Sequence, residues 1–287
     1  MSMSLREAIK SAAAEGRALG HFNVSDSVAL RAVAEAAGEL QVPVLIGVSE
    51  GEREFLGVRQ IAALVRSLRE AGRPVFLNAD HTHSLEKIRE AVEAGFDAVL
   101  LDGGKLSLEE NIAKTREVVE YVRSVSPETI VEGELGYIGS SSAMLAELPP
   151  DAALRPEELT SAEQAEEFVR TTGVDLLSPA VGNIHGMLRN APNPALDIPR
   201  IKAIRDRAGV PLVLHGGSGI SDADISAAVR SGMAIVHINT ELRRAWRTGL
   251  ERGLAAAPEE VAPYKIYPDA LRAMKEVVSA KLRLFGG

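Results

Sequence analysis

The sequence PVFLNADHTHSLEKIREAVEAGFDAVLLDGG spans residues 74–104 and contains one complete strand–helix–strand pattern. An apolar run, Pro74–Asp80, is followed by an amphipathic stretch, Ser84–Ala94, and then by a second apolar run, Ala98–Gly103. Strands that are apolar along their whole length and joined by a helix are typical of a parallel sheet covered by helices. We therefore predict a strand–helix–strand unit within an α/β fold.

The same rhythm recurs along the whole chain. Eight apolar runs have strand length, namely Gly20–Val24, Val42–Val48, Pro74–Asp80, Ala98–Gly103, Ile130–Gly136, Leu176–Gly182, Val210–Gly217 and Met233–Thr240. The predicted helices between them are Ser27–Leu40, Arg59–Ala71, Ser84–Ala94, Leu108–Ser124, Ser161–Thr172, Pro199–Arg207 and Ser221–Ser231. Eight such units favour a closed (β/α)₈ TIM barrel, formed as one domain over residues 1–287. An open doubly wound sheet is the alternative.

Two regions depart from this rhythm. Gly139–Glu158 forms a long connection after the fifth predicted strand, and connections of this length are often functional. Residues 241–287 predict a C-terminal helical extension, with a Pro-containing turn at Ala257–Pro268 and a closing helix at Asp269–Leu284. This extension exceeds one barrel helix, so we expect it to cover the barrel or a partner subunit.

Composition excludes several classes of protein. The 287 residues are 46% hydrophobic and 25% charged, with a net charge of −8 and no cysteine. No basic cluster is present, which argues against binding to nucleic acid or to an anionic membrane. The N-terminus lacks an apolar signal core, so we expect a cytoplasmic protein. Without thiolates, any metal must bind to His, Asp, Glu or backbone oxygen.

The histidines gather where the predicted strands end. Five of the six lie after or near strand ends: His81, His83, His185, His215 and His237. His21 lies nearer the start of the first strand and is expected to lie apart. Strand ends of a barrel converge on the face that carries active sites. A single histidine there is ordinarily structural, but His81, His185 and His215 together fit a zinc site with three protein ligands. His83 is expected beside the ligands or at a helix start.

Carboxylates accompany these histidines. Asp80 directly precedes His81, and Asp102 ends the fourth predicted strand. Glu132 and Glu134 share the fifth strand, and we expect only one of them to face the barrel interior. Glu134, nearer the strand end, is the candidate for the site. Glu132 is expected either in the interior or in an ion pair on the helix-facing side.

A glycine-rich turn predicts an anion site. His215-Gly216-Gly217-Ser218-Gly219 ends the seventh strand and precedes a helix, and Asn239-Thr240 ends the eighth. Glycines allow the backbone N–H groups to approach an anion closely. Phosphate often binds between the loops after strands seven and eight of a barrel. A simple tight turn is the alternative.

At these residues the chain resembles the class II, metal-dependent ketose-bisphosphate aldolases, which include fructose- and tagatose-1,6-bisphosphate aldolases. The resemblance covers nearly the whole chain in order. The matching segments are GHFNVSD, VPVLIGVSEGEREFLG, LNADHTHSLEKIREAVEAGFDAVLLDGG, LSLEENI, VEGELGYIG, VGNIHG, VLHGGSGIS and KEVVSAKLRLFG. It implies zinc-dependent, reversible cleavage of a ketose 1,6-bisphosphate, foremost fructose 1,6-bisphosphate, to dihydroxyacetone phosphate and glyceraldehyde 3-phosphate. Such a reaction belongs to carbohydrate metabolism, and glycolysis is its expected setting.

The resemblance also implies roles for individual residues. Asp80 takes the catalytic acid/base role, and the zinc ligands are His81, His185 and His215. A second or alternative metal position falls on Asp102 and Glu134, with Glu134 also a catalytic candidate. Implied substrate contacts are Asn23, Ser49, Gly186, Gly216, Gly217, Ser218, His237, Asn239 and Thr240. Co²⁺, Mn²⁺ or Fe²⁺ could replace Zn²⁺, a monovalent cation is a further implied cofactor, and a homodimer or homotetramer is expected.

Two positions depart from the family pattern. Many members carry GGxED after ELG, with a Glu proposed to move the C1 proton; here the loop is GYIGSSSAML, and Glu147 follows at a different spacing. His237 stands where the family usually has Asn. These changes leave tagatose 1,6-bisphosphate, or another dihydroxyacetone-phosphate adduct, as an alternative substrate.

Two other functions compete with that of a metal-dependent aldolase, namely an aldolase with an amine mechanism and a protein that does not catalyse. An amine mechanism needs a buried strand lysine, and no predicted strand contains one. A non-catalytic sugar-phosphate sensor is the further alternative, and the presence of Asp80 beside all three candidate ligands argues against it.

Overall fold

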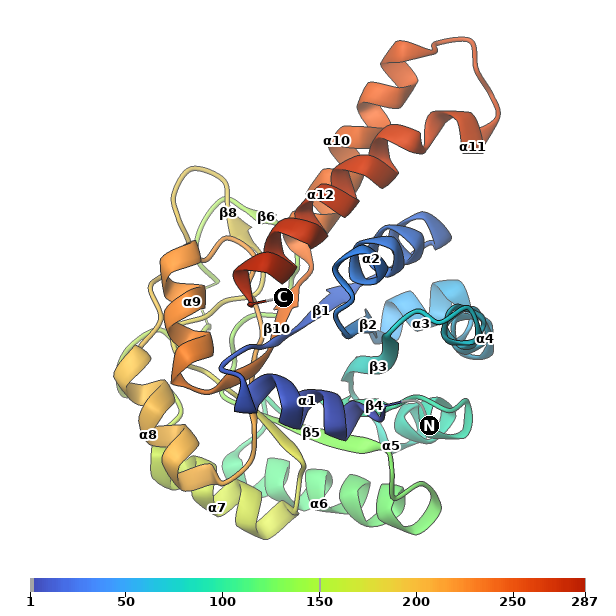
Figure 1. The fold of residues 1–287 in the computed structure, drawn as a ribbon. Coiled ribbons are helices and arrows are strands. Elements are labelled where there is room, and N and C mark those ends of the chain that lie inside the picture. Colours follow the sequence, from blue (N-terminus) through green and yellow to red (C-terminus); the bar gives the residue numbers. More distant parts are fainter. Residues whose placement is uncertain (1–2, 150, 287) are drawn as a thin grey trace.

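The computed structural model describes residues 3–149 and 151–286. Eight parallel strands close into a barrel in the order β1-β10-β9-β7-β5-β4-β3-β2 (Figure 1). Their bounds are β1 Leu19–Asn23, β2 Val44–Val48, β3 Val75–Thr82, β4 Ala98–Leu101, β5 Ile130–Leu135, β7 Leu176–Pro179, β9 Leu212–Leu214 and β10 Met233–Ile238. The predicted barrel and its eight strands are confirmed.

Helices surround the barrel on its outer face. Their bounds are α1 Leu5–Ala14, α2 Ser27–Leu40, α3 Glu50–Leu56, α4 Val58–Glu70, α5 Leu85–Glu93, α6 Leu108–Val125, α7 Ala162–Thr172, α8 Ile198–Ala208, α9 Asp222–Ser231, α10 Thr240–Ala256, α11 Pro263–Ile266 and α12 Pro268–Leu284. Many begin at a side chain that accepts a backbone N–H of the first turn, as Asp26 does for α2 and Ser84 for α5. Within the described residues, no helix is long and apolar enough to cross a membrane.

The lower part of the barrel interior is apolar and closed. Side chains of Leu45, Phe76 and Ile130 form a cluster there together with Leu5 and Ile9 of α1. Helix α1, absent from the sequence-based prediction, begins with a reciprocal Ser4–Glu7 cap and covers the amino-terminal ends of the strands. Burial of this layer leaves only the carboxyl-terminal end of the barrel for polar side chains.

Two further elements were missed by the sequence patterns. Helix α3 follows β2 directly, and its seven residues are too short and too charged to show an apolar period. The long connection after β5 contains β6, Met144–Leu145, which pairs in parallel with β8, Met187–Leu188. This pairing holds the connection across the carboxyl-terminal end of the barrel.

Helices α10, α11 and α12 form a hairpin that projects away from the barrel (Figure 1). Helix α12 returns along α10 and packs against α2. The two long helices approach closely at Gly249, where a Cβ atom would lie 2.4 Å from Ala270 Cα. The C-terminal helical region is therefore present as predicted.

Candidate active site

The predicted site residues converge at the carboxyl-terminal end of the barrel. A cavity there is lined by Asn23, Asp80, His81, Ser142, His185, Gly186, Gly216, Ser218, His237, Asn239 and Thr240. These residues come from six segments that lie far apart in the chain. Closure of the barrel brings the segments together, because parallel strands place all their carboxyl ends on one face.

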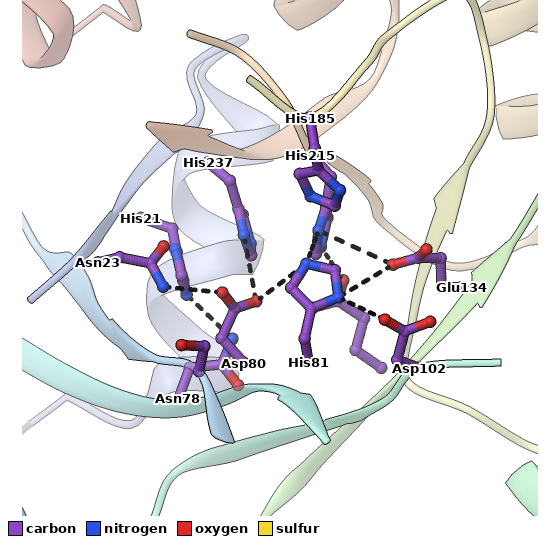
Figure 2. A network of polar contacts seen from close by, with 12 residues as sticks. His21, Asn23, Asn78, Asp80, His81, Asp102, Glu134, His185, His215 and His237 are labelled. Carbon is purple, nitrogen blue, oxygen red and sulfur yellow. Dashed lines mark hydrogen bonds and ion pairs between the residues drawn. The ribbon is translucent and has the colours of Figure 1, made fainter. Parts of the chain in front are cut away.

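Three imidazoles face one another in this cavity. One ring nitrogen from each of His81, His185 and His215 lies within 4.8 Å of the others. His81 Nε2 and His215 Nδ1 are 3.1 Å apart. Figure 2 shows His185 and His215 next to His81, which lies between Asp80 on one side and Asp102 and Glu134 on the other. Their spacing suits ligands that share one cation.

The second nitrogen of each imidazole already has an acceptor. Because an acceptor requires an N–H, it fixes the tautomer and leaves a lone pair on the converging nitrogen. The contacts are His81 Nδ1 to Asp102 Oδ2 at 3.0 Å, His185 Nδ1 to Gly139 O at 2.6 Å and His215 Nε2 to Glu132 Oε1 at 2.8 Å. The converging nitrogens are the ones that would bind a divalent cation, with His81 giving up the extra proton that its raised pKa retains, so these residues fit the metal implied by the resemblance.

An irregular strand end turns two consecutive side chains into the same cavity. Neighbouring residues of a regular strand point to opposite faces. The register of β3 against β4 shifts between Ala79 and Thr82, and His81 has a φ of 38°. Such a conformation is uncommon outside glycine and is often found at functional sites. It places both Asp80 and His81 against the cavity.

The expectation that only one of Glu132 and Glu134 faces the interior is wrong. Residues two apart in a strand share a face, and both side chains are buried inside the barrel. Glu132 contacts His215, whereas Glu134 Oε2 lies 3.7 Å from His81 Nδ1. Burial raises the pKa of Glu132 to about 8 and that of Glu134 well above its usual range, where Asp102 adds repulsion.

Asp80 presents one free oxygen to the cavity. Its Oδ2 accepts a hydrogen bond from Asn23 Nδ2 at 2.9 Å. Among the described residues its Oδ1 has no hydrogen-bond partner, and it lies 3.6 Å from His237 Nδ1 and 3.8 Å from His81 Nε2. Burial opposes ionisation, but the adjacent His81 and the other imidazoles outweigh it and lower the pKa of Asp80. Asp80 is therefore ionised and keeps one oxygen free toward the cavity.

The environment of His81 favours positive charge. Burial disfavours its protonated form, but Asp80, Asp102 and Glu134 outweigh that effect and raise the pKa of His81 to about 10. A divalent cation would supply the same positive charge to these carboxylates. The nitrogen ligands and the surrounding negative charge thus both suit a bound cation.

His21 does not lie apart, contrary to expectation. Its ring stacks on that of His237 with centroids 3.5 Å apart, and His237 in turn stacks on His215 at 3.9 Å (Figure 2). His21 Nε2 contacts Asn78 Nδ2 at 3.1 Å. Burial lowers the pKa of His21 to about 4 and that of His237 well below its usual range, so both rings are neutral. The spacing of His21 and Asn23, two apart on one strand, was the available signal.

The glycine turn packs tightly against the strand ends. Gly216 has a φ of 64°, and a Cβ atom there would lie 2.1 Å from Ile184 O. Ser218 Oγ accepts the backbone N–H groups of Asn239 and Glu241, both at 3.2 Å, and so joins the turn to the start of α10. Backbone N–H groups at such a helix start attract anions.

Several candidates are not part of the cavity lining in the described chain. His215, Asp102 and Glu134 reach the cavity only through their contacts with His81. Gly217 donates its backbone N–H to His237 O.

Three further candidates also lie outside the lining. Ser49 caps α3, and its hydroxyl donates to Glu52 Oε2 at 2.9 Å. Glu147 is exposed in the connection after β5, and His83 is exposed and takes part in none of the possible metal-binding groups. Ser142, in the GYIGSSSAML loop that replaces the acidic residue of the family, does line the cavity.

Comparisons with known proteins agree with this geometry. The family model described as fructose-bisphosphate aldolase class-II matches residues 3–287. A protein named "Probable fructose-bisphosphate aldolase" from Bacillus subtilis is 35% identical over 290 residues, covering 99% of this chain and 97% of its own. A fructose-bisphosphate aldolase from Geobacillus stearothermophilus is 34% identical, covering 99% and 96%.

A solved structure shows the same architecture. The crystal structure of the YdjI aldolase from Escherichia coli K12 is similar with a TM-score of 0.84 and 32% identity, covering 100% of this chain and 98% of its own. Family model, relatives and fold thus confirm the resemblance found in the sequence. The chain belongs to the class II fructose-bisphosphate aldolase family of aldehyde-lyases.

Proposed function

We propose that this aldolase reversibly cleaves fructose 1,6-bisphosphate to dihydroxyacetone phosphate and glyceraldehyde 3-phosphate, with Zn²⁺ held by His81, His185 and His215. One observation carries the proposal: three oriented imidazoles converge beside the free Oδ1 of Asp80. The names of the relatives support the substrate. The proposed setting is cytoplasmic, within carbohydrate metabolism and glycolysis.

The metal site would hold the cation through three neutral imidazoles. A divalent cation bound there supplies a Lewis acid that stabilises negative charge on the donor fragment. Asp102 and Glu134 lie close enough to His81 to offer a second or alternative position. Co²⁺, Mn²⁺ and Fe²⁺ suit the same nitrogen ligands, and a monovalent cation is a further proposed cofactor.

Asp80 is the proposed general base. Its free Oδ1 accepts the proton of the C4 hydroxyl as the carbon–carbon bond breaks, and returns it to the aldehyde oxygen during condensation. Asn23 holds the other oxygen and so keeps Oδ1 directed into the cavity. His237, 3.6 Å from that oxygen, contacts the same end of the substrate.

The donor phosphate is proposed to bind where the glycine turn meets α10. Gly216 and Ser218 supply backbone N–H groups. The N–H of Gly217 donates to His237 O, so Gly217 contributes through the close approach that its missing side chain permits. Asn239 and Thr240 contribute side chains, each with a buried polar atom that has no hydrogen-bond partner among the described residues. Gly186 lines the facing wall of this cavity. Binding of the phosphate positions the reacting carbons, which lowers the entropic part of the barrier.

Metal removal gives the first test of the mechanism. We expect a chelator to abolish cleavage and added Zn²⁺ or Co²⁺ to restore it. Borohydride with substrate should leave the enzyme active, because no lysine lies among the cavity residues of the described chain to form an imine. Inactivation by borohydride, combined with full activity in chelator, would contradict the metal mechanism.

The connection after β5 is proposed to handle the C1 proton of the donor fragment and to exclude water. We expect Ser142→Ala to slow exchange of the C1 proton of dihydroxyacetone phosphate, because Ser142 lines the cavity. Glu147→Gln should have a smaller effect, because Glu147 is exposed. Proton exchange followed by NMR in D₂O measures both. Unchanged exchange after truncating Ser140, Ser141, Ser142 and Glu147 together would show that the proton is handled elsewhere, by His237 or by water at the metal.

Two departures from the family pattern favour a second candidate substrate: His237 stands in place of Asn, and the loop after β5 lacks the acidic residue. Tagatose 1,6-bisphosphate or another dihydroxyacetone-phosphate adduct would differ at the carbon that Asp80 and His237 face. Release of dihydroxyacetone phosphate from a panel of ketose phosphates identifies the preferred one. Binding without turnover of any panel member would favour a sugar-phosphate sensor.

Self-association is also proposed. Val261 and Tyr264, at the tip of the α10–α12 hairpin, are 88% and 76% exposed. Apolar side chains on such a projection suit burial against a second copy, and we propose a homodimer or homotetramer. In this view residues 1–287 act as one domain, with 241–287 as its extension. Light scattering of the purified protein measures the assembly.

A further inference from the structure

A buried carboxylate outside the predicted site is bonded to several functional side chains. Glu52 of α3 is only 7% exposed. Its Oε2 accepts hydrogen bonds from Asn23 Nδ2 at 3.0 Å, Ser49 N at 2.8 Å and Ser49 Oγ at 2.9 Å. Its Oε1 accepts one from Arg243 Nη2 at 2.7 Å. These four donors fill about all the acceptor positions of a carboxylate.

This cluster lies at the Asp80 end of the cavity. The amide of Asn23 donates to both Asp80 and Glu52. Arg243 also donates to Ser142 O, at 3.3 Å. A second cavity of about 320 Å³ is lined by Asn23, Glu52 and Arg243, and therefore adjoins the first. The fragment beyond the bond that Asp80 cleaves would lie against these side chains.

We propose that Glu52 is a specificity-determining residue, which holds Arg243 and thereby lowers the preference for a phosphorylated aldehyde. The inference rests on the aldolase reaction proposed above. A guanidinium binds phosphate well, and Arg243 is 47% exposed to the cavity and solvent. Its charge is offset by Glu52, so that less of it is available to an incoming dianion. The hydroxyl proton of Ser49 is likewise donated to Glu52 rather than to an anion.

A purely structural role for Glu52 gives a different expectation. In that case it would only orient Asn23 and cap α3, and its loss would impair all substrates equally. Glu52→Gln separates the two roles because it preserves shape. Its amide oxygen can still accept from Asn23 and Ser49, while its NH₂ group faces Arg243 and cannot accept. The variant therefore releases Arg243 and keeps the surroundings of Asp80.

The test compares two ketoses that differ only in the aldehyde-side phosphate. The kcat/KM for fructose 1,6-bisphosphate is divided by that for fructose 1-phosphate, so that changes at the metal or at Asp80 cancel. We expect Glu52→Gln to raise this ratio about twofold to fivefold, mainly through KM, because a contact with the half-exposed Arg243 has the strength of an exposed ion pair. Arg243→Met should lower the ratio, and the double variant should match Arg243→Met because Glu52 acts through Arg243.

A matched control removes one carboxylate elsewhere. Glu35→Gln breaks an exposed pair with Arg31 on α2 and changes the net charge equally. Its ratio should equal that of the wild type. Circular dichroism checks that each variant is folded.

Several results would overturn the inference. An unchanged or lower ratio in folded Glu52→Gln, or a raised ratio in the double variant, would show that Glu52 does not act through Arg243. Should Glu52→Gln fail to fold, Arg243→Met alone decides: Glu52 already offsets the guanidinium, so the ratio should fall by less than about fivefold. A larger loss contradicts the inference. A wild type that cleaves neither ketose would overturn the proposed function as well.

Discussion

Replacing Asp80 with alanine is expected to lower the rate of cleavage by about 10²–10⁴-fold, the usual contribution of a general base. The Oδ1 of Asp80 is the oxygen that would take the C4 hydroxyl proton, because it has no hydrogen-bond partner among the described residues and lies 3.6 Å from His237 Nδ1. Release of dihydroxyacetone phosphate from fructose 1,6-bisphosphate measures the loss. A pre-steady-state measurement separates it from slow product release.

The same variant should keep two other properties. Asp80 is not among the three imidazoles proposed as ligands, so bound zinc measured by atomic absorption should stay near the wild-type level. Exchange of the C1 proton of dihydroxyacetone phosphate should also persist, because it needs the metal and the phosphate site but not this base. Loss of zinc together with both activities would show that Asp80 only supports the ligand His81.

Loss of a single imidazole ligand is the second large effect. We expect His81→Ala, His185→Ala and His215→Ala each to lower metal affinity by more than about 100-fold. Loss of a residue that only hydrogen-bonds to a metal ligand lowers metal affinity on the order of 10–100-fold. Each of these three histidines would bind the metal directly. Metal content after dialysis and competition with a chromophoric chelator give the affinities, and cleavage should fall with them.

Two variants serve as references for this series. His83→Ala should retain its metal, because His83 is exposed and belongs to none of the groups that could bind an ion. Glu132→Gln should lose less metal than His215→Ala, because Glu132 only accepts the N–H of His215. Full metal content in His185→Ala would mean that the third ligand is wrongly assigned.

The barrel and much of its site could be predicted from local patterns. Each strand is apolar along its length because both faces of a parallel sheet are covered. Such an apolar run can be recognised in the sequence without knowing which strands lie beside it. The turn His215–Gly219 could be found in the same way, since its glycines reflect a local backbone requirement. The histidines at strand ends followed from topology, because a barrel brings all carboxyl ends of its strands to one face.

Shorter elements and orientations escaped these patterns. Helix α3 and the β6–β8 pair are too short to show a period, and their formation depends on the segments they pack against. The positive φ of His81, which turns it into the cavity beside Asp80, depends on the β3–β4 register. The placement of Glu132 was an error of strand geometry rather than a limit of the sequence.

The sequence by itself determined the barrel fold, the family resemblance and the kinds of side chain that gather at the carboxyl-terminal end of the barrel. Tertiary structure alone decided which atoms meet. His21 reaches Asn78 across 57 positions, and Glu52 reaches Arg243 across 191. Such contacts cannot be found from sequence periodicity, because each joins two distant segments that only the closed barrel brings within reach. The free oxygen of Asp80 and the orientation of each imidazole are set by these distant partners.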